Sequence, residues 1–234
     1  MAQYGFYFDQ TACAGCHTCQ IACKDKNRLE VGELLRTVHS YETGEFPNVG
    51  IYHMAKTCAH CDNPACVTAC PTKRTLKDEA TGIVYHDPNG VCAGEMCLRC
   101  VEACPYHHPI YKADAKKVVK CDMCKDLIEK GQAPACVASC MMRALKFGPI
   151  DELKALYGDA VTALPCFPDG ATGPNMLINA RECAKEAAFE ELLSELYELT
   201  EERPKEFFAV MQRVRKAIDE YTFTRNFEKR IRKL

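Results

Sequence analysis

The sequence predicts an α+β fold made of four similar units, followed by a helical C-terminal region. Three observations lead to this prediction. Sixteen of the eighteen cysteines fall into four groups of four, and a run with strand character precedes each group. Residues 181–234 instead carry apolar side chains at helical spacing. Because strand and cysteine group recur in the same order, the chain contains an internal repeat.

The expected strands and turns follow this order along the chain. The strand-like runs are residues 4–9, 49–54, 82–85 and 117–120, and a closing strand is expected over residues 144–147. Thr81 and Gly82 should form the tip of a hairpin, because glycine readily adopts turn conformations. A short helix should follow Cys19.

The spacing of the four cysteine groups indicates iron-sulfur clusters. The groups are Cys13, Cys16, Cys19 and Cys23; Cys58, Cys61, Cys66 and Cys70; Cys92, Cys97, Cys100 and Cys104; and Cys121, Cys124, Cys136 and Cys140. Three closely spaced thiolates bind one cubane, and a cysteine three residues further on reaches a second cluster. We therefore predict four [4Fe-4S] clusters, held by two modules of two clusters each.

Disulfides and zinc are the other uses of so many cysteines. A disulfide scaffold is normally a short secreted chain, and residues 1–20 lack the apolar core and cleavage site of a secretory signal. Structural zinc sites usually pair two C-x2-C elements across about 15 to 20 residues, whereas here three or four cysteines crowd into one loop. A zinc-stabilised interaction module stays open as the alternative from another class of protein.

Charge, hydropathy and missing motifs exclude several functions. Thirty Lys and Arg against 32 Asp and Glu leave a formal net charge of −2, so no positive field is available to bind nucleic acid. No run approaches the roughly 18 consecutive apolar residues of a membrane-spanning helix. No glycine motif for dinucleotides or phosphates is present. Since a cubane with four thiolates has no open coordination position, we predict an electron-transfer subunit without catalytic residues.

The C-terminal third differs from the cysteine-rich part. Residues 165–174 are rich in proline and glycine, so residues 151–180 are expected to form an extended loop. Two amphipathic helices are expected within residues 181–234, the second beginning near Pro204. Their apolar positions are Phe189, Leu192, Leu193 and Leu196, and then Phe207, Met211, Val214, Ile218 and Tyr221. Such a helical hairpin is more typical of docking or bracing than of catalysis.

Several other residues are expected to have ordinary roles. Cys166 and Cys183 lie outside the four groups, and we expect both to be simple thiols. The adjacent His107 and His108 are more typical of a packing pair than of residues that tune a cluster or relay a proton. A solvated face is likewise the expected role of four basic residues, Lys112, Lys116, Lys117 and Lys120.

Local sequence around the cysteines resembles one known family. The chain is similar, over roughly residues 1–180, to the four-cluster [4Fe-4S] ferredoxin subunits of molybdopterin oxidoreductases, and within these to the ferredoxin-type subunit of the dimethyl sulfoxide reductase family. The runs that carry the resemblance are Gly5-Phe6-Tyr7, Cys23-Lys24-Asp25, Cys58-Ala59-His60-Cys61, Cys70-Pro71, Cys104-Pro105-Tyr106, Lys120-Cys121-Asp122, Arg143-Ala144-Leu145 and Phe147-Gly148-Pro149. Residues 181–234 have no counterpart in it.

The resemblance implies two bacterial-ferredoxin-like modules, one nested in the other. Residues 1–45 and 114–150 would form the outer module, and residues 46–113 the inner one. The implied ligand sets are Cys13, Cys16, Cys19 and Cys140; Cys121, Cys124, Cys136 and Cys23; Cys58, Cys61, Cys66 and Cys104; and Cys92, Cys97, Cys100 and Cys70.

The family also implies partners. Such subunits pass electrons between a molybdenum or tungsten bis-pterin catalytic subunit and a quinone-binding membrane subunit or a soluble carrier. The complex would be membrane-associated, on the cytoplasmic side or exported folded with a catalytic partner that carries a twin-arginine signal. A subunit of a hydrogenase or formate-hydrogen lyase complex is the alternative within the same class.

Two departures from the family pattern concern ligands. Four residues separate Cys92 from Cys97 where the family usually has two, so a [3Fe-4S] cluster is the alternative at this site. We expect four ligands there, because no other thiol lies in that loop. Met141 follows Cys140 where a proline is common, which affects packing and not ligation.

Overall fold

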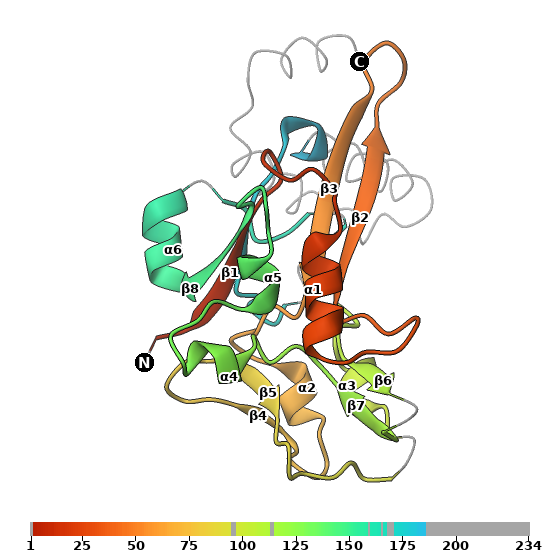
Figure 1. The fold of residues 1–234 in the computed structure, drawn as a ribbon, viewed down its shortest axis with the longest axis vertical. Coiled ribbons are helices and arrows are strands. Elements are labelled where there is room, and N and C mark those ends of the chain that lie inside the picture. The colour runs from red at the N-terminus through yellow and green to blue at the C-terminus, as the bar shows by residue number, and fades with distance from the viewer. Residues whose placement is uncertain are drawn as a thin grey trace, which may run out of the picture. The chain divides into compact units, whose positions relative to one another are not determined.

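The structure, a computed structural model, describes residues 2–94, 97–112, 115–158, 160–164, 166–167 and 171–185. The chain divides into two compact units, Met1–Glu42 with Ile51–Ala180, and Thr43–Gly50 with Arg181–Leu234. All sixteen grouped cysteines belong to the first unit, which mixes short helices and strands as predicted (Figure 1). The predicted C-terminal helical hairpin falls almost entirely outside the described residues.

A three-stranded sheet joins the beginning of the first unit to its end. Its central strand, β1 (Tyr4–Asp9), pairs antiparallel with β8 (Leu145–Pro149) and parallel with β9 (Met176–Asn179). Phe6 lies opposite Phe147 on one side and Met176 on the other, and Phe6 is fully buried. Since β1 precedes the first cysteine group and β8 follows the fourth, the sheet brings these two groups close together.

Two small hairpins flank the third cysteine group. The strands β4 (Thr75–Lys77) and β5 (Val84–His86) pair antiparallel, as do β6 (Ile110–Lys112) and β7 (Lys117–Val119). Gly82 lies in the predicted turn with a φ of 67°, a backbone conformation that favours glycine. A Cβ at this position would come within 2.1 Å of the Gln3 amide, so a larger residue would also displace this side chain.

A longer two-stranded ribbon lies between the first two cysteine groups. It is formed by β2 (Arg36–Thr43) and β3 (Gly50–Thr57), of which only β3 was predicted. The Tyr41 and Tyr52 rings stack across it with centroids 5.1 Å apart. Val38 connects the ribbon to the neighbouring helix, because its backbone N–H donates to Gln20 Oε1 at 2.9 Å.

Five short helices lie in or next to the cysteine groups. The helices are α1 (Thr18–Lys26), α2 (Ala65–Thr68), α3 (Arg99–Glu102), α4 (Lys125–Ile128) and α5 (Ala135–Ala138). All but α4, which directly follows Cys124, contain one or two of the cysteines. The predicted helix after Cys19 is confirmed as α1, although it begins just before this residue. Helix α1 packs against α5, and α2 packs against α3. Figure 1 shows α2, α3 and the two small hairpins gathered at one end of the first unit.

The predicted extended loop over residues 151–180 is wrong at both of its ends. Helix α6 (Ile150–Tyr157) and strand β9 occupy part of this range. Ile150, Leu153 and Leu177 pack with Tyr7 in a separate apolar cluster, and the rings of Tyr7 and Tyr157 stack 3.8 Å apart. Burial of this apolar surface stabilises the helix, so the range does not remain an irregular loop.

Candidate metal centres

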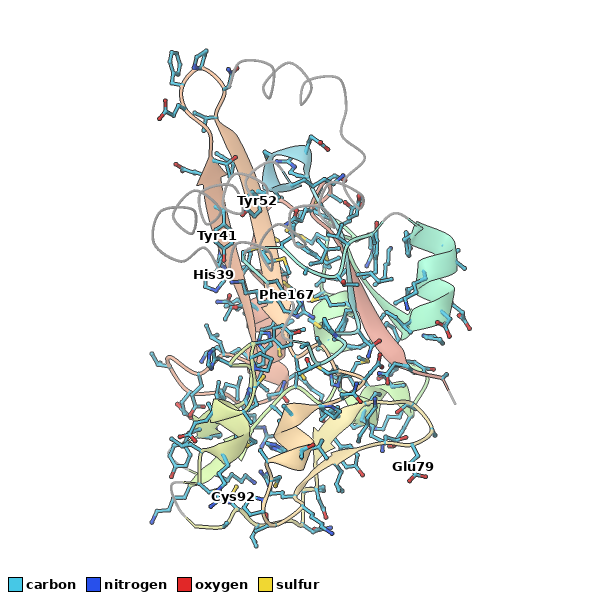
Figure 2. The ribbon with its side chains drawn as sticks, turned by 180° about the vertical axis from the view of Figure 1, so that it is seen from behind. His39, Tyr41, Tyr52, Glu79, Cys92 and Phe167 are labelled. Carbon is cyan, nitrogen blue, oxygen red and sulfur yellow. The ribbon has the colours of Figure 1, made fainter. Side chains whose placement is uncertain are left out.

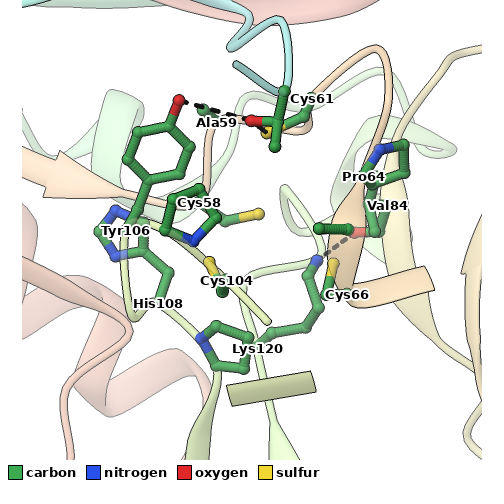
Figure 3. Close-up of a pocket in the computed structure, with 14 residues that line it drawn as sticks. Cys58, Ala59, Cys61, Pro64, Cys66, Val84, Cys104, Tyr106, His108 and Lys120 are labelled. Carbon is green, nitrogen blue, oxygen red and sulfur yellow. Dashed lines mark hydrogen bonds between the residues drawn. The ribbon is translucent and has the colours of Figure 1, made fainter. Parts of the chain in front are cut away.

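Four cysteines from two groups line one pocket in the first unit, which we call the first thiol pocket. They are Cys58, Cys61, Cys66 and Cys104. All but Cys61 are at most 9% exposed. Figure 3 shows the side chains of these cysteines around one common space, together with Tyr106, His108 and Lys120. Three thiols come from the second group, and the fourth is the last cysteine of the third group.

Lys120 and Thr172 are among the polar side chains that line the first thiol pocket. Lys120 is only 6% exposed, and its ammonium group donates to the carbonyl oxygens of Val84 and Cys121. The Thr172 hydroxyl donates to Cys61 Sγ at 3.2 Å. The sequence prediction of a solvated face was therefore wrong for Lys120, because its side chain is buried and binds the Val84 and Cys121 carbonyls.

A second set of four cysteines lines another pocket, the second thiol pocket. They are Cys70, Cys92, Cys97 and Cys100, and only Cys100 is buried. Figure 2 shows Cys92 at the end of the first unit that carries the two small hairpins. Here three thiols come from the third group and one from the second, which is the reverse of the first thiol pocket.

Hydrogen bonds to sulfur surround the second thiol pocket. The Thr75 backbone N–H donates to Cys70 Sγ at 3.5 Å, and the Thr72 hydroxyl lies 3.8 Å from the same sulfur. Arg74 Nη1 donates to Cys92 Sγ at 3.7 Å. This pocket therefore offers donors to two of its four sulfur atoms.

The protonation chemistry of the thiols differs between the pockets. Burial raises the pKa of Cys61 to about 11 and that of Cys66 to about 12. Burial also tends to raise the pKa of Cys70, but hydrogen bonds from Thr75, Thr72 and the Arg74 backbone lower it to about 7. In Cys100, burial and then the neighbouring Cys70 raise the pKa to about 11. Hydrogen bonds thus outweigh burial at Cys70, whereas burial outweighs the hydrogen bonds at Cys61 and Cys100.

The first and fourth cysteine groups lie together, since β1 pairs with β8 and α1 packs against α5. Burial raises the pKa of Cys19 to about 11, and the nearby thiolates of Cys136 and Cys140 add to this effect. Burial raises the pKa of Cys23 to about 12, with Cys136 and Cys124 adding to it. Cys16 is exposed, Cys13 and Cys121 are half-buried, and the remaining members of the two groups are buried.

A buried arginine accompanies these two groups. Arg36 is 1% exposed, and its guanidinium group lies 5.0 Å from the centre of the Phe6 ring. Its Nη1 donates to the Ala55 carbonyl at 3.3 Å, while Nε and Nη2 have no hydrogen-bond partner among the described residues. Burial tends to lower its pKa, but the thiolates of Cys136 and Cys19 raise it. Arg36 is thus a fixed positive charge beside the thiols of both groups.

The donor chemistry of these sites fits iron-sulfur clusters. Thiolates are the ligands, and metal binding releases their protons. Buried thiols with raised pKa values become stable thiolates only beside a positively charged group, which iron supplies. A single zinc ion would need its thiolates at about 2.3 Å. Among the described residues, no three His, Cys, Asp or Glu side chains come together closely enough to hold one metal ion.

Residues outside the four groups show what sequence reasoning missed. Arg36, Arg74 and Thr172 had no motif that marked them, because they lie far along the sequence from the sulfur atoms they approach. His108 lines the first thiol pocket, and burial lowers its pKa to about 3. It is therefore neutral at physiological pH and packs against the pocket.

Cys166 and Cys183 line neither thiol pocket. Cys166 packs against the main apolar core of the first unit. In the second unit, Cys183 lies against Gly50, where an added Cβ would come within 2.5 Å of the Cys183 Cβ. Both are half-buried residues.

Comparison with known proteins identifies the family. Residues 49–150 match the family described as the 4Fe-4S dicluster domain. The chain is 37% identical to a chain of the anaerobic dimethyl sulfoxide reductase of Haemophilus influenzae over 194 residues, which cover 79% of this chain and 93% of the relative. It is 40% identical to the identically named protein from Escherichia coli over 184 residues, which cover 75% of this chain and 88% of the relative.

A relative with a different name is also similar. The chain is 39% identical to protein NrfC of Escherichia coli over 152 residues, which cover 64% of this chain and 67% of the relative. In the described part of the chain, no helix is both long and apolar enough to span a membrane. The chain is an iron-sulfur electron-transfer subunit and not a catalytic one. Its extensive identity to the two reductase chains shows that it belongs to the family of iron-sulfur chains of anaerobic dimethyl sulfoxide reductase.

Proposed function

We propose that this protein holds four [4Fe-4S] clusters and passes electrons between a molybdopterin catalytic subunit and a membrane quinone-binding subunit or a soluble carrier. When bound, the clusters supply one-electron transfer. The protein supplies the thiolates, the buried surroundings and the charges near the sulfur atoms. Substrate chemistry takes place on the catalytic partner.

The lining of the two thiol pockets is the observation that carries this proposal. Each pocket takes three thiols from one cysteine group and the last thiol from another. This exchange is the arrangement expected when two clusters share two cysteine groups. The proposed ligands are Cys58, Cys61, Cys66 and Cys104 in the first thiol pocket and Cys92, Cys97, Cys100 and Cys70 in the second.

The two outer clusters are proposed on related grounds. Their ligands would be Cys13, Cys16, Cys19 and Cys140, and Cys121, Cys124, Cys136 and Cys23. The packing of α1 against α5 and the pairing of β1 with β8 support the sharing of two clusters between the first and fourth groups. Cys140 raises the pKa of Cys19, and Cys124 raises that of Cys23, so these thiols lie near each other. This proximity supports the same exchange of fourth ligands. These contacts favour a nested arrangement over two consecutive modules.

The partners follow from the family. Relatives of this protein are named as chains of an anaerobic dimethyl sulfoxide reductase, which favours a molybdopterin catalytic partner over a hydrogenase or formate-hydrogen lyase complex. We place the complex at a membrane, and assign residues 181–234 to docking on a partner. The 4Fe-4S family match also favours iron-sulfur clusters over the zinc alternative.

Metal analysis of anaerobically purified protein tests the proposal. Four cubanes predict about sixteen irons and sixteen acid-labile sulfides per chain, with a brown absorbance that bleaches on reduction. About fifteen irons would indicate one [3Fe-4S] cluster. A colourless protein that contains zinc, or a stoichiometry near eight irons, would contradict it. Co-purification of the full-length chain, and of a variant without residues 181–234, tests the partner and docking assignments.

A further inference from the structure

Arg74 is a buried arginine whose side chain contacts two backbone carbonyls and two side chains from three separate segments. It is 5% exposed. Its Nε donates to the Gly90 carbonyl at 3.0 Å, and its Nη1 donates to the Val118 carbonyl at 2.7 Å. Nη1 also lies 3.1 Å from His86 Nδ1 and 3.7 Å from Cys92 Sγ. One guanidinium group therefore connects β5, β7 and the loop that leads to Cys92.

The loop over residues 87–92 depends on this arginine and its neighbours. The backbone N–H of Asp87 donates to the Arg74 carbonyl at 2.8 Å, and the Thr72 hydroxyl donates to the Val91 carbonyl at 2.8 Å. Gly90 lies directly on the arginine side chain, since a Cβ there would come within 2.8 Å of Arg74 Cγ. The segment that follows Cys70 thus holds the loop at its beginning, its middle and its end.

Cys92 needs such support more than the other cysteines of its group. Cys100 is part of α3, and Cys97 lies two residues before this helix. Cys92 is separated from Cys97 by four residues, so the spacing constrains it less than a C-x2-C element would. Among the described side chains of the pocket, Arg74 is also the one that donates a charged N–H to Cys92 Sγ.

We propose that Arg74 is the positioning residue for Cys92 in the second thiol pocket. Its fork of N–H donors fixes the loop of residues 87–92, so that the Cys92 thiolate can bind the fourth iron despite the longer spacing. Its charged N–H group also stabilises negative charge on Cys92 Sγ, which raises the reduction potential of the cluster in this pocket. The inference rests on the proposed function, because it requires a cluster at this site.

Substitution of Arg74 tests the inference through the type of cluster formed. Arg74→Gln removes the charge and the fork, and Arg74→Lys keeps the charge but loses the fork. The matched control is Lys73→Gln, which changes the exposed neighbouring residue. The readouts are iron per chain, the electron paramagnetic resonance spectrum of the oxidised protein, and the reduction potentials. An oxidised [3Fe-4S] cluster is paramagnetic, whereas an oxidised [4Fe-4S] cluster is diamagnetic.

The expected result is the loss of iron at one site only. Both Arg74 variants should lose about one of roughly sixteen irons and show a three-iron signal in the oxidised protein. Cys92→Ala should give the same signal, and Lys73→Gln should match the wild type. If Arg74→Gln loses every cluster and Arg74→Lys does not, the glutamine variant is misfolded. The iron content and three-iron signal of Arg74→Lys then test the positioning role.

Two outcomes separate the inference from the proposed function. Full iron content, no three-iron signal and unchanged potentials in Arg74→Lys would overturn the positioning role while the four-cluster function stands. A wild-type protein without iron would contradict the proposed function itself. A three-iron signal already present in the wild type would also overturn the inference, because Cys92 would then not bind iron although Arg74 is in place.

Discussion

The two thiol pockets differ in how they surround four cysteines of the same kind. In the first thiol pocket, three of the four cysteines are buried, and burial raises the pKa of Cys61 and Cys66. In the second, one of the four is buried, and hydrogen bonds lower the pKa of Cys70 to about 7. The cysteine groups therefore supply four thiols to each pocket, and the surrounding residues set the electrostatics of these thiols.

This difference has a consequence for electron transfer. The reduction potential of a cluster depends on its net charge, on hydrogen bonds to its sulfur atoms and on its exposure to solvent. Greater exposure and more donors stabilise the reduced, more negative form. We therefore expect the cluster of the second thiol pocket to have the higher potential, although Lys120 adds a positive charge beside the first.

The largest expected effect comes from removing one buried ligand from either pocket. Cys66→Ser and Cys100→Ser form a matched pair, since both residues lie in short helices and are 8% and 7% exposed. Each variant should lose between about one and four irons from its own pocket and leave the other clusters assembled. Iron analysis and electron paramagnetic resonance check this. Loss of all cluster signals in either variant would count against independent pockets.

A second prediction concerns the buried cation of the first thiol pocket. Lys120→Met removes the ammonium group that binds the Val84 and Cys121 carbonyls. The potential of the cluster in this pocket should fall, because the reduced form loses a nearby positive charge. The free energy of unfolding should also fall by about 1–3 kcal/mol, since two carbonyls lose their donor.

The control for this change is Lys117→Met, which alters an exposed lysine of the same chain segment. Potentiometric titration and denaturant unfolding of the anaerobic protein measure the two effects. An unchanged potential in Lys120→Met would show that the ammonium group is too far from the cluster to matter.

A smaller effect is expected from a single hydroxyl group. Thr172→Val removes the donor to Cys61 Sγ and keeps the shape of the side chain. The potential of the cluster in the first thiol pocket should fall slightly, because one hydrogen bond to sulfur is lost. Thr172→Ser keeps the hydroxyl group and should retain the wild-type potential. Equal shifts in both variants would instead indicate a packing effect.

The smallest effect concerns the ion pair that connects the β4–β5 hairpin to α4. Lys125 Nζ lies 2.5 Å from Asp78 Oδ2, and its hydrogen bond lowers the pKa of Asp78 to about 2. A depressed folded-state pKa stabilises the fold above the unfolded-state pKa of about 4, and this contribution is lost as the pH falls from about 4 to about 2.

Acid unfolding of Asp78→Asn checks this contribution. The variant should be less stable than the wild type above pH 4 and should approach it at lower pH, because the wild type loses its ion pair there. The exposed Glu79 next to Asp78 offers a control substitution, Glu79→Gln. A constant stability difference between Asp78→Asn and the wild type at all pH values would contradict the prediction.

The sequence predicted the parts of the molecule that depend on local pattern. The strand runs before the cysteine groups appear as β1, β3, β5 and β7, and the turn at Gly82 joins β4 and β5. Helix α6 was missed, although Ile150, Leu153 and Tyr157 have helical spacing and Asp151 and Glu152 lie in the first turn. The proline- and glycine-rich residues 165–174 led to the prediction of a loop over the whole range of residues 151–180, including the helix.

The residues around the sulfur atoms could not be predicted from local pattern. Arg74 is separated by 18 residues from Cys92 and by 44 from Val118. Thr172 lies 111 residues from Cys61. Such contacts depend on how hairpins and loops pack in three dimensions. The series of lysines that includes Lys120 suggested a solvated face, but a series of basic residues carries no information about which of them is buried. The cysteine spacing, in contrast, predicted that each site takes three thiols from one group and one from another, and the family resemblance predicted which groups pair.

The most direct test of the account is a potentiometric titration of the anaerobic protein, followed by electron paramagnetic resonance. The wild type is compared with Cys66→Ser and Cys100→Ser. We predict that the two variants remove different signals, and that the signal lost in Cys100→Ser has the higher potential. If both variants removed the same signal, the two thiol pockets would not hold separate clusters, and the central claim would be wrong.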